Sequence, residues 1–168
     1  MRRDDHSLLT IHHSPIVAES MSWIGTPYRH QASVKGVGCD CLGLVRGVWR
    51  ALYGREPEAM PGYTPDWAEA GGSETLAAAA ARHMTRIVPE DAREGDVLLF
   101  RWRDTMPAKH LGIIILAGEG NRRFVHAQQG AAVSPATLTP WWRRRVAHAF
   151  RFPAVSNNTG LLSVQPSP

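Results

Sequence analysis

The sequence predicts an α+β domain in which N-terminal helices pack on an antiparallel β-sheet. Apolar residues recur at helical spacing before residue 84, whereas short apolar or alternating runs bounded by turn residues follow residue 95. This order, helices first and strands second, is typical of the α+β class. A length of 168 residues fits one domain. We place that domain at 1–155 and expect a flexible polar tail at 156–168.

The first helix is predicted at residues 16–24 (IVAESMSWI). Ser14 is a suitable N-cap, and Pro15 suits the first helical position because its missing N–H would be unpaired there. Gly25 supplies the residue that commonly ends a helix.

The strongest helical pattern covers residues 41–53, with Asp40 as N-cap and Gly54 as stop. Gly43 and Gly47 lie inside it, each costing up to about 1 kcal/mol of helix propensity relative to Ala. We expect these glycines to permit close packing against the sheet. One apolar stripe is formed by Cys41, Leu44, Val45, Val48 and Leu52.

Two aperiodic stretches, 29–39 and 55–72, are predicted to be loops, and residues 73–84 a further helix capped by Ser73. Four strands and the start of a short fifth one follow, at 97–102, 111–116, 122–127, 146–152 and Val133.

The net charge of +4 suits polyanions in general, and Arg143, Arg144 and Arg145 follow two tryptophans. A merely solvated basic face is the alternative. No zinc-finger spacing, basic zipper helix or RNA-binding aromatic motif occurs, so the sequence favours no nucleic-acid partner. There is neither a membrane-length apolar run nor a signal peptide, so we expect synthesis in the cytoplasm.

The two cysteines, Cys39 and Cys41, are separated by one residue, which is poor spacing for a mutual disulfide. Cys41 takes the first position of the strongest predicted helix, where unpaired N–H groups and the helix dipole favour a thiolate. Cys41 is therefore the candidate nucleophile, and Cys39, which precedes the cap, is expected to be structural.

Of the eight histidines, His110 and His126 lie at the outer ends of one predicted hairpin. With the turn centred on Glu119, His126 faces Gly112, two residues from His110. Both imidazoles then project from one face as diagonal neighbours, within reach of a hydrogen bond. A shift of the turn centre by half a residue would separate them.

Several short motifs follow one another along the chain: WIGTPYRH (23–30), DCLGLVRGVWR (40–50), GDVLLF (95–100), HLGIII (110–115) and FVHA (124–127). Together and in this order they resemble the NlpC/P60 family of papain-like cysteine peptidases, which cut peptides of the bacterial cell wall. The resemblance implies a papain-like fold.

The resemblance also implies roles. Cys41 would be the nucleophile, His110 the general base and His126 the polar residue that orients His110. Tyr28 would line the site near the oxyanion, and Asp40 would help to arrange the amino end of the substrate. The implied substrates are peptidoglycan stem peptides, typically cut between D-γ-glutamyl and a diamino acid, with no metal or cofactor.

The chain departs from the family pattern at Leu42, where the family commonly has a serine that contributes to the substrate pocket. It also carries no SH3-like or LysM-like targeting domain. It thus resembles the branch found in phage tails and gene transfer agents, which implies tail hub or tip proteins as partners. We expect a protein carried on a tail tip that opens the wall during entry and acts in the periplasm or cell wall.

Three alternatives remain open. A metal site could use Cys39, Cys41, His110 and His126, although Cys-x-Cys is not the usual zinc spacing. The chain could instead be a catalytically silent structural component of a tail. It could also be another acyltransferase or amidase on the same fold.

Overall fold

A curved, wholly antiparallel six-stranded sheet organises the computed structural model, which describes residues 14–60, 62, 73–118 and 120–155. The helices are α1 (Pro15–Ser22), α2 (Cys41–Tyr53), α3 (Thr75–His83), the 3₁₀ helix η1 (Pro89–Asp91) and α4 (Pro140–Arg143). The strands are β1 (Ser33–Val34), β2 (Gly38–Cys39), β3 (Thr85–Ile87), β4 (Val97–Phe100), β5 (His110–Gly118), β6 (Asn121–His126), β7 (Ser134–Thr137) and β8 (Val146–Arg151).

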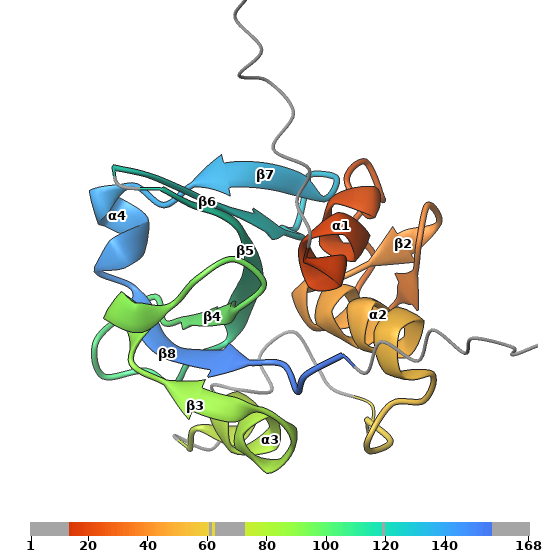
Figure 1. The fold of residues 1–168 in the computed structure, drawn as a ribbon, viewed down its shortest axis with the longest axis horizontal. Coiled ribbons are helices and arrows are strands. Elements are labelled where there is room, and N and C mark those ends of the chain that lie inside the picture. The colour runs from red at the N-terminus through yellow and green to blue at the C-terminus, as the bar shows by residue number, and fades with distance from the viewer. Residues whose placement is uncertain (1–13, 61, 63–72, 119, 156–168) are drawn as a thin grey trace, which may run out of the picture.

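The six strands run in the order β3-β8-β4-β5-β6-β7, and α1 and α2 lie on one side of this sheet while α4 lies on the other (Figure 1). Two apolar clusters follow from this arrangement, because alternate residues of a strand point to opposite faces. Val97, Leu99, Leu111 and Ile113 pack with α1 and α2, whereas Leu98, Phe100, Ile114 and Phe124 pack on the side of α4. The predicted α+β class is confirmed. The predicted tail at 156–168 lies outside the described residues.

The starts of the two N-terminal helices are capped as predicted. The Ser14 side chain accepts a hydrogen bond from the N–H of Val17 at 3.4 Å, and Asp40 accepts one from Gly43 at 2.7 Å. The second helix covers the predicted residues and ends at Gly54, whose φ of 85° favours glycine. No helix in the described ranges combines the length and the apolar run needed to cross a bilayer.

Gly43 and Gly47 permit close packing, but not against the sheet as predicted. A Cβ on Gly47 would lie 2.0 Å from the indole of Trp23, just after α1. A Cβ on Gly43 would lie 1.9 Å from the carbonyl oxygen of Ala32. The glycines therefore let α2 approach the α1 end and the preceding loop.

Several local predictions were wrong. The loop predicted at 29–39 contains the β1–β2 hairpin, and the edge strand β3 and the helix α4 were not predicted. The N-cap position of α3 is Glu74 rather than Ser73, and its side chain makes no capping bond. Glu74 instead accepts a hydrogen bond from the N–H of Ala108 at 3.1 Å, a tertiary contact that local sequence cannot reveal.

The β5–β6 hairpin has the predicted register at the histidines, but its turn is centred elsewhere and a β-bulge corrects the offset. Next to the turn, Gly118 pairs with Asn121, half a residue away from the predicted turn centre. A β-bulge between Ile114 and Leu116 then takes up one residue of β5 and restores the predicted pairing of Ile113 with Val125. The two histidines consequently share one face of the sheet.

Replacing Gly47 with Ala should destabilise the protein by about 1–3 kcal/mol, although alanine favours a helix, because the methyl group would displace Trp23. Chemical denaturation would measure this. Gly118→Ala is the matched control, since a Cβ there meets nothing within 4 Å. Equal stability of the two variants would contradict the packing argument.

Candidate active site

A cleft of about 290 Å³ opens where the first turn of α2 meets the start of β5. It brings together four of the five residues that the sequence singled out, Tyr28, Asp40, Cys41 and His110. The fifth, His126, does not line the cleft and contacts His110 from the interior. The rest of the lining consists of His30, Leu42, Leu76, Trp102, Lys109, Ala127, Gln128 and Gln129.

Asp40 fixes the position of the helix start. One carboxylate oxygen accepts the N–H of Gly43, and the other accepts the N–H of Gln31, each at 2.7 Å. Gln31 has a φ of 63°, in the left-handed region that is unusual for a residue with a side chain, and its N–H points at the carboxylate. The buried carboxylate therefore ties the preceding loop to α2 and sets where Cys41 begins the helix.

The Cys41 thiol lies at the first helical position, half-buried in the floor of the cleft. Burial, and next the charge of Asp40, raise its pKa to about 12. Hydrogen bonds from the backbone N–H groups of Leu111, Leu42 and Cys41 itself act in the opposite direction. The expectation of a lowered thiol pKa was thus wrong for this cleft, because burial and the carboxylate outweigh the helix start. The bond from Leu111 also places the sulfur beside His110.

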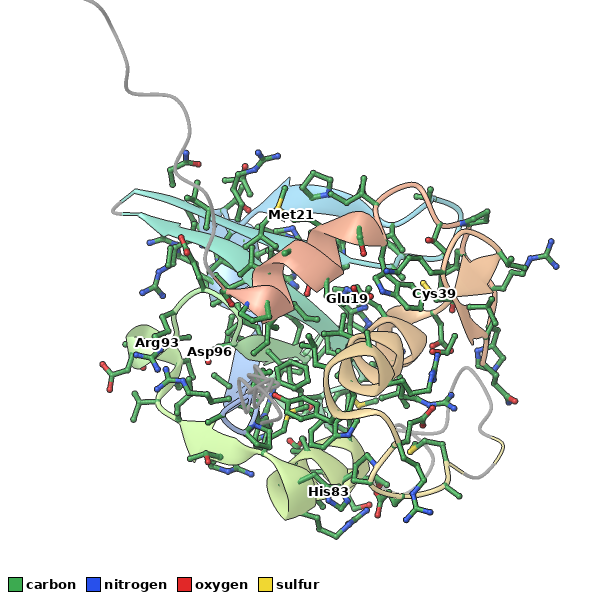
Figure 2. All side chains as sticks on the ribbon, turned by 45° about the vertical axis from the view of Figure 1, so that its right-hand side comes forward. Glu19, Met21, Cys39, His83, Arg93 and Asp96 are labelled. Atoms are coloured by element: carbon green, nitrogen blue, oxygen red, sulfur yellow. The ribbon has the colours of Figure 1, made fainter. Side chains whose placement is uncertain are left out.

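Cys39 lies in the interior between α2 and the β1–β2 hairpin (Figure 2), fully buried, as expected of a structural residue. Burial and the Asp40 charge raise its pKa to about 12. Tyr28 forms a parallel bridge with Cys39, which places the phenol in the cleft. Burial, then Asp40 and Cys41, raise the pKa of Tyr28, so the phenol keeps its proton as a hydrogen-bond donor.

The two histidines form a hydrogen-bonded pair, with His110 Nε2 at 2.9 Å from His126 Nδ1. Both are buried, with 6% and 4% of their surface exposed. Burial and the neighbouring His126 lower the pKa of His110 to about 3, and burial lowers the pKa of His126 to about 4. Near neutral pH the pair is therefore uncharged, and one nitrogen of each ring carries a hydrogen.

Aromatic side chains surround the pair. The indole of Trp102 stacks on His110 with centroids 5.6 Å apart, and Phe124 packs on His126 at 4.9 Å. Trp142, from α4, contacts both imidazoles, at 5.8 Å from His110 and 5.3 Å from His126. These rings remove the pair from solvent, which is the physical cause of its lowered pKa values.

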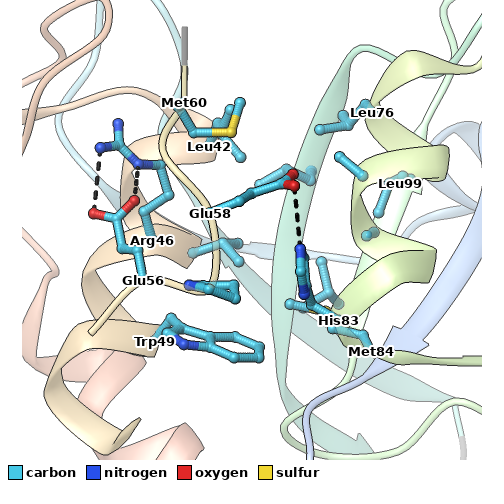
Figure 3. A pocket seen from close by; sticks show the side chains of 16 residues that line it. Leu42, Arg46, Trp49, Glu56, Glu58, Met60, Leu76, His83, Met84 and Leu99 are labelled. Carbon is cyan, nitrogen blue, oxygen red and sulfur yellow. Dashed lines mark hydrogen bonds and ion pairs between the residues drawn. The ribbon is translucent and has the colours of Figure 1, made fainter. Parts of the chain in front are cut away.

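A second cavity, of about 80 Å³, lies between α2 and α3 (Figure 3). Its floor is apolar, and the acidic segment at its rim is held by ion pairs of Glu56 with Arg46 and of Glu58 with His83. Leu42 and Leu76 line both this cavity and the cleft. Among the described residues that line this cavity there is no cysteine, serine, threonine or lysine.

Across the described ranges, no three His, Cys, Asp or Glu side chains gather in a way that could hold a metal ion. The residues of the predicted alternative metal site do not gather at one point. Cys39 is enclosed in the core on the α2 side, whereas His110 and His126 face the aromatic rings on the α4 side.

Among the residues of the site that sequence reasoning missed are Gln31, Trp102, Lys109 and Trp142. Thr139 followed by Pro140 is a helix-start signal that could have revealed α4 and hence Trp142. Gln31 gave no signal, because its left-handed backbone depends on the Asp40 carboxylate.

Comparison with known proteins agrees with this geometry. The NlpC/P60 family matches residues 25–151, more than half of the chain. The chain belongs to the NlpC/P60 family. The gamma-DL-glutamyl hydrolase of Bacillus subtilis (strain 168) is 28% identical over 142 residues, which cover 82% of this chain and 29% of that protein. This chain thus spans under a third of that relative.

Solved structures give the same assignment. The NlpC/P60 domain of the peptidoglycan hydrolase SagA is 27% identical, with a TM-score of 0.54 over 82% of this chain and 97% of that domain. NlpC2 from Trichomonas vaginalis shares the fold, at 20% identity and a TM-score of 0.53 over 82% of this chain and 44% of that one.

The buried neutral histidines predict acid sensitivity. Below the ordinary pKa of 6.5 the unfolded imidazoles take up protons, whereas folded His126 does so only near 4 and His110 near 3. Stability is therefore fully present above about pH 6.5 and falls with pH, by about 1.4 kcal/mol per pH unit for each histidine. Thermal melts between pH 7 and 4 should show a shallower dependence for His126→Gln than for the parent protein. Parallel curves would contradict the burial of a neutral His126.

Proposed function

We propose that the protein is a cysteine peptidase that hydrolyses amide bonds of peptidoglycan stem peptides. The observation that carries this proposal is the meeting, in one cleft, of a cysteine at a helix start and His110, which is hydrogen-bonded to the buried His126 behind it. The names of the B. subtilis relative and of SagA support hydrolysis of glutamyl or peptidoglycan bonds. An adjacent nucleophile, base and orienting group are the parts that acyl transfer needs.

The hydrogen bond between the histidines sets which nitrogen acts as the base. His110 Nε2 is engaged with His126, so Nδ1 is the nitrogen available for the thiol proton. Nδ1 can accept a proton only when Nε2 carries the hydrogen and donates it to Nδ1 of His126. His126 must therefore be neutral, with its own hydrogen on Nε2. Its lowered pKa keeps it in that form.

Because the resting pair is thiol and imidazole, attack and proton transfer go together. The Cys41 proton passes to Nδ1 of His110 as the sulfur adds to the substrate carbonyl carbon. The tetrahedral oxyanion is held by the Cys41 N–H and the Tyr28 hydroxyl, and one such donor contributes about 3 kcal/mol in the transition state. His110 returns the proton to the leaving amine as the C–N bond breaks. Water then releases the acyl group from the sulfur, with His110 again as base.

The cleft around Cys41 has both apolar and polar lining residues. Leu42 and Leu76 are apolar, while His30, Lys109 and Gln128 are among the polar residues of the lining. Both carboxylate oxygens of Asp40 accept backbone N–H groups, so we propose that it arranges the substrate through the loop it holds. The bond between D-γ-glutamyl and a diamino acid is the proposed cleavage point. Leu42 in place of serine makes the pocket beside it more apolar than in the common family pattern.

We also propose that a phage-like tail carries the enzyme, after cytoplasmic synthesis, to the periplasmic cell wall. The resemblance to tail-associated members and the basic Arg143–Arg145 run, which fits docking to tail hub or tip proteins, support this proposal. Proteomics of gradient-purified particles from the producing bacterium tests it. The protein should co-purify with tail components, and particles that lack it would contradict tail delivery.

Cys41→Ala should abolish hydrolysis without unfolding the protein. Mass spectrometry of purified peptidoglycan after digestion would measure this, since new stem-peptide fragments also identify the cleaved bond. Cys39→Ala is the matched control, because it removes the other thiol and should leave the fragments unchanged. Full activity of Cys41→Ala would overturn the peptidase proposal. An inactive parent protein would favour a structural component or an enzyme active only on its partner.

His110→Ala should lower kcat/KM by about 10²–10⁴-fold, the usual contribution of a general base. His126→Ala should leave a higher residual rate, because the base remains but its tautomer is no longer fixed. His126→Asn should recover part of that loss, since the amide oxygen of asparagine can accept the hydrogen bond from Nε2–H of His110. Steady-state kinetics on a stem peptide would decide. A larger loss for His126→Ala than for His110→Ala would mean that the two roles are exchanged.

A further inference from the structure

Trp142 contacts both members of the histidine pair. Its ring is nearly parallel to His110, at 30°, and nearly perpendicular to His126, at 87°. Trp102 stacks on His110 and Phe124 packs on His126, but each covers one imidazole. The indole of Trp142 therefore covers the hydrogen bond between the two imidazoles.

The position of Trp142 is fixed by packing. Its ring contacts Phe100 and Phe124, with centroids 4.9 and 5.1 Å away, on the inner face of the sheet. The helix that carries it starts at Pro140 and is tied back by Arg143, whose Nε donates to the carbonyl of Leu138 at 3.0 Å. A four-residue helix is thus anchored on β4 and β6, the two neighbours of β5 in the sheet.

Burial keeps His110 and His126 uncharged. The charged or titratable groups facing the pair are Cys41, Tyr28, Asp40 and His30 across the cleft and Lys109 beside His110 on the same strand. On the other side, α4 contributes Arg143 and β6 contributes Arg122 and Arg123, and neither element contains a carboxylate. These two elements therefore offer no acid that would stabilise an imidazolium, and burial by the rings disfavours the charged form.

We propose that Trp142 is a positioning residue that keeps water from the His110–His126 hydrogen bond and thereby holds His110 with its free lone pair on Nδ1. If His126 took up a proton, its Nδ1–H would donate to His110 Nε2 and force the hydrogen of His110 onto Nδ1. The base would then be unable to accept the thiol proton. This role in catalysis rests on the proposed peptidase function, whereas the control of the histidines by Trp142 does not.

Trp141 offers a matched control on the same helix. It is 44% exposed, packs edge-on against Trp142 at 4.9 Å and stacks with Arg145. In the described part of the chain it makes no ring contact with either histidine. The Trp141→Leu variant therefore loses an aromatic ring from the same helix but leaves the histidine pair covered.

The experiment is an imidazole ¹⁵N–¹H NMR titration of the parent protein, Trp142→Leu and Trp141→Leu, with signals assigned through His110→Gln and His126→Gln. In Trp142→Leu the midpoints of both histidines should rise by about one pH unit or more towards 6.5, because water reaches the rings. In Trp141→Leu they should stay within about 0.3 units. Trp142→Phe should give a smaller rise, and it replaces Trp142→Leu should that variant fail to fold.

Kinetics on a stem peptide complete the test. The acid limb of kcat/KM should move to higher pH in Trp142→Leu, with kcat lowered and KM little changed, since the indole does not line the cleft. Unchanged histidine midpoints in a folded Trp142→Leu, or equal shifts in Trp141→Leu, would overturn the proposal. Absence of hydrolysis by the parent protein would count against the peptidase function alone, because the NMR titration needs no substrate.

Discussion

The register of β5 on β6 is the constraint on which the site depends. Side chains alternate along a strand, so an offset of one residue would send His110 and His126 to opposite faces. The turn at Gly118 and Asn121 by itself gives that wrong offset, and the bulge at Ile114–Leu116 corrects it. A local irregularity in the middle of a buried strand thus creates the hydrogen bond between the two imidazoles at the far end of the hairpin.

The chemistry of the cleft follows from competition between burial and polar contacts. At the start of α2, backbone N–H groups around the Cys41 sulfur favour a thiolate, but burial and the nearby Asp40 carboxylate favour the thiol more strongly. On the β5 side, burial keeps His110 neutral. The two partners therefore meet uncharged, and in the proposed mechanism the proton moves as the sulfur attacks a substrate carbonyl. Such a site avoids the cost of holding a separated charge pair in a partly apolar cleft.

The two faces of the sheet divide the work of the fold. On one face, α1 and α2 build the larger core and present Cys41, the proposed nucleophile, at a helix start. On the other, Phe100, Phe124 and Trp142 enclose the histidines. Cys41 and His110 meet only at the edge, where the first turn of α2 reaches the first residue of β5. Each half of the site is thus held by a separate apolar cluster.

The sequence by itself determined the class of fold, the bounds of α2, its Asp40 cap and the candidates Cys41, His110 and His126, because these depend on local periodicity and capping. It also identified the hairpin, whose first strand is long and apolar. Only the tertiary structure decided the thiol pKa, the left-handed Gln31 and the cover of Trp142 on the histidine pair. Each of these arises from groups far apart in the chain, and burial, unlike helix periodicity, is a property of the assembled whole. The short elements β3 and α4 escaped prediction for the same reason, since their few residues are held by neighbours rather than by their own pattern.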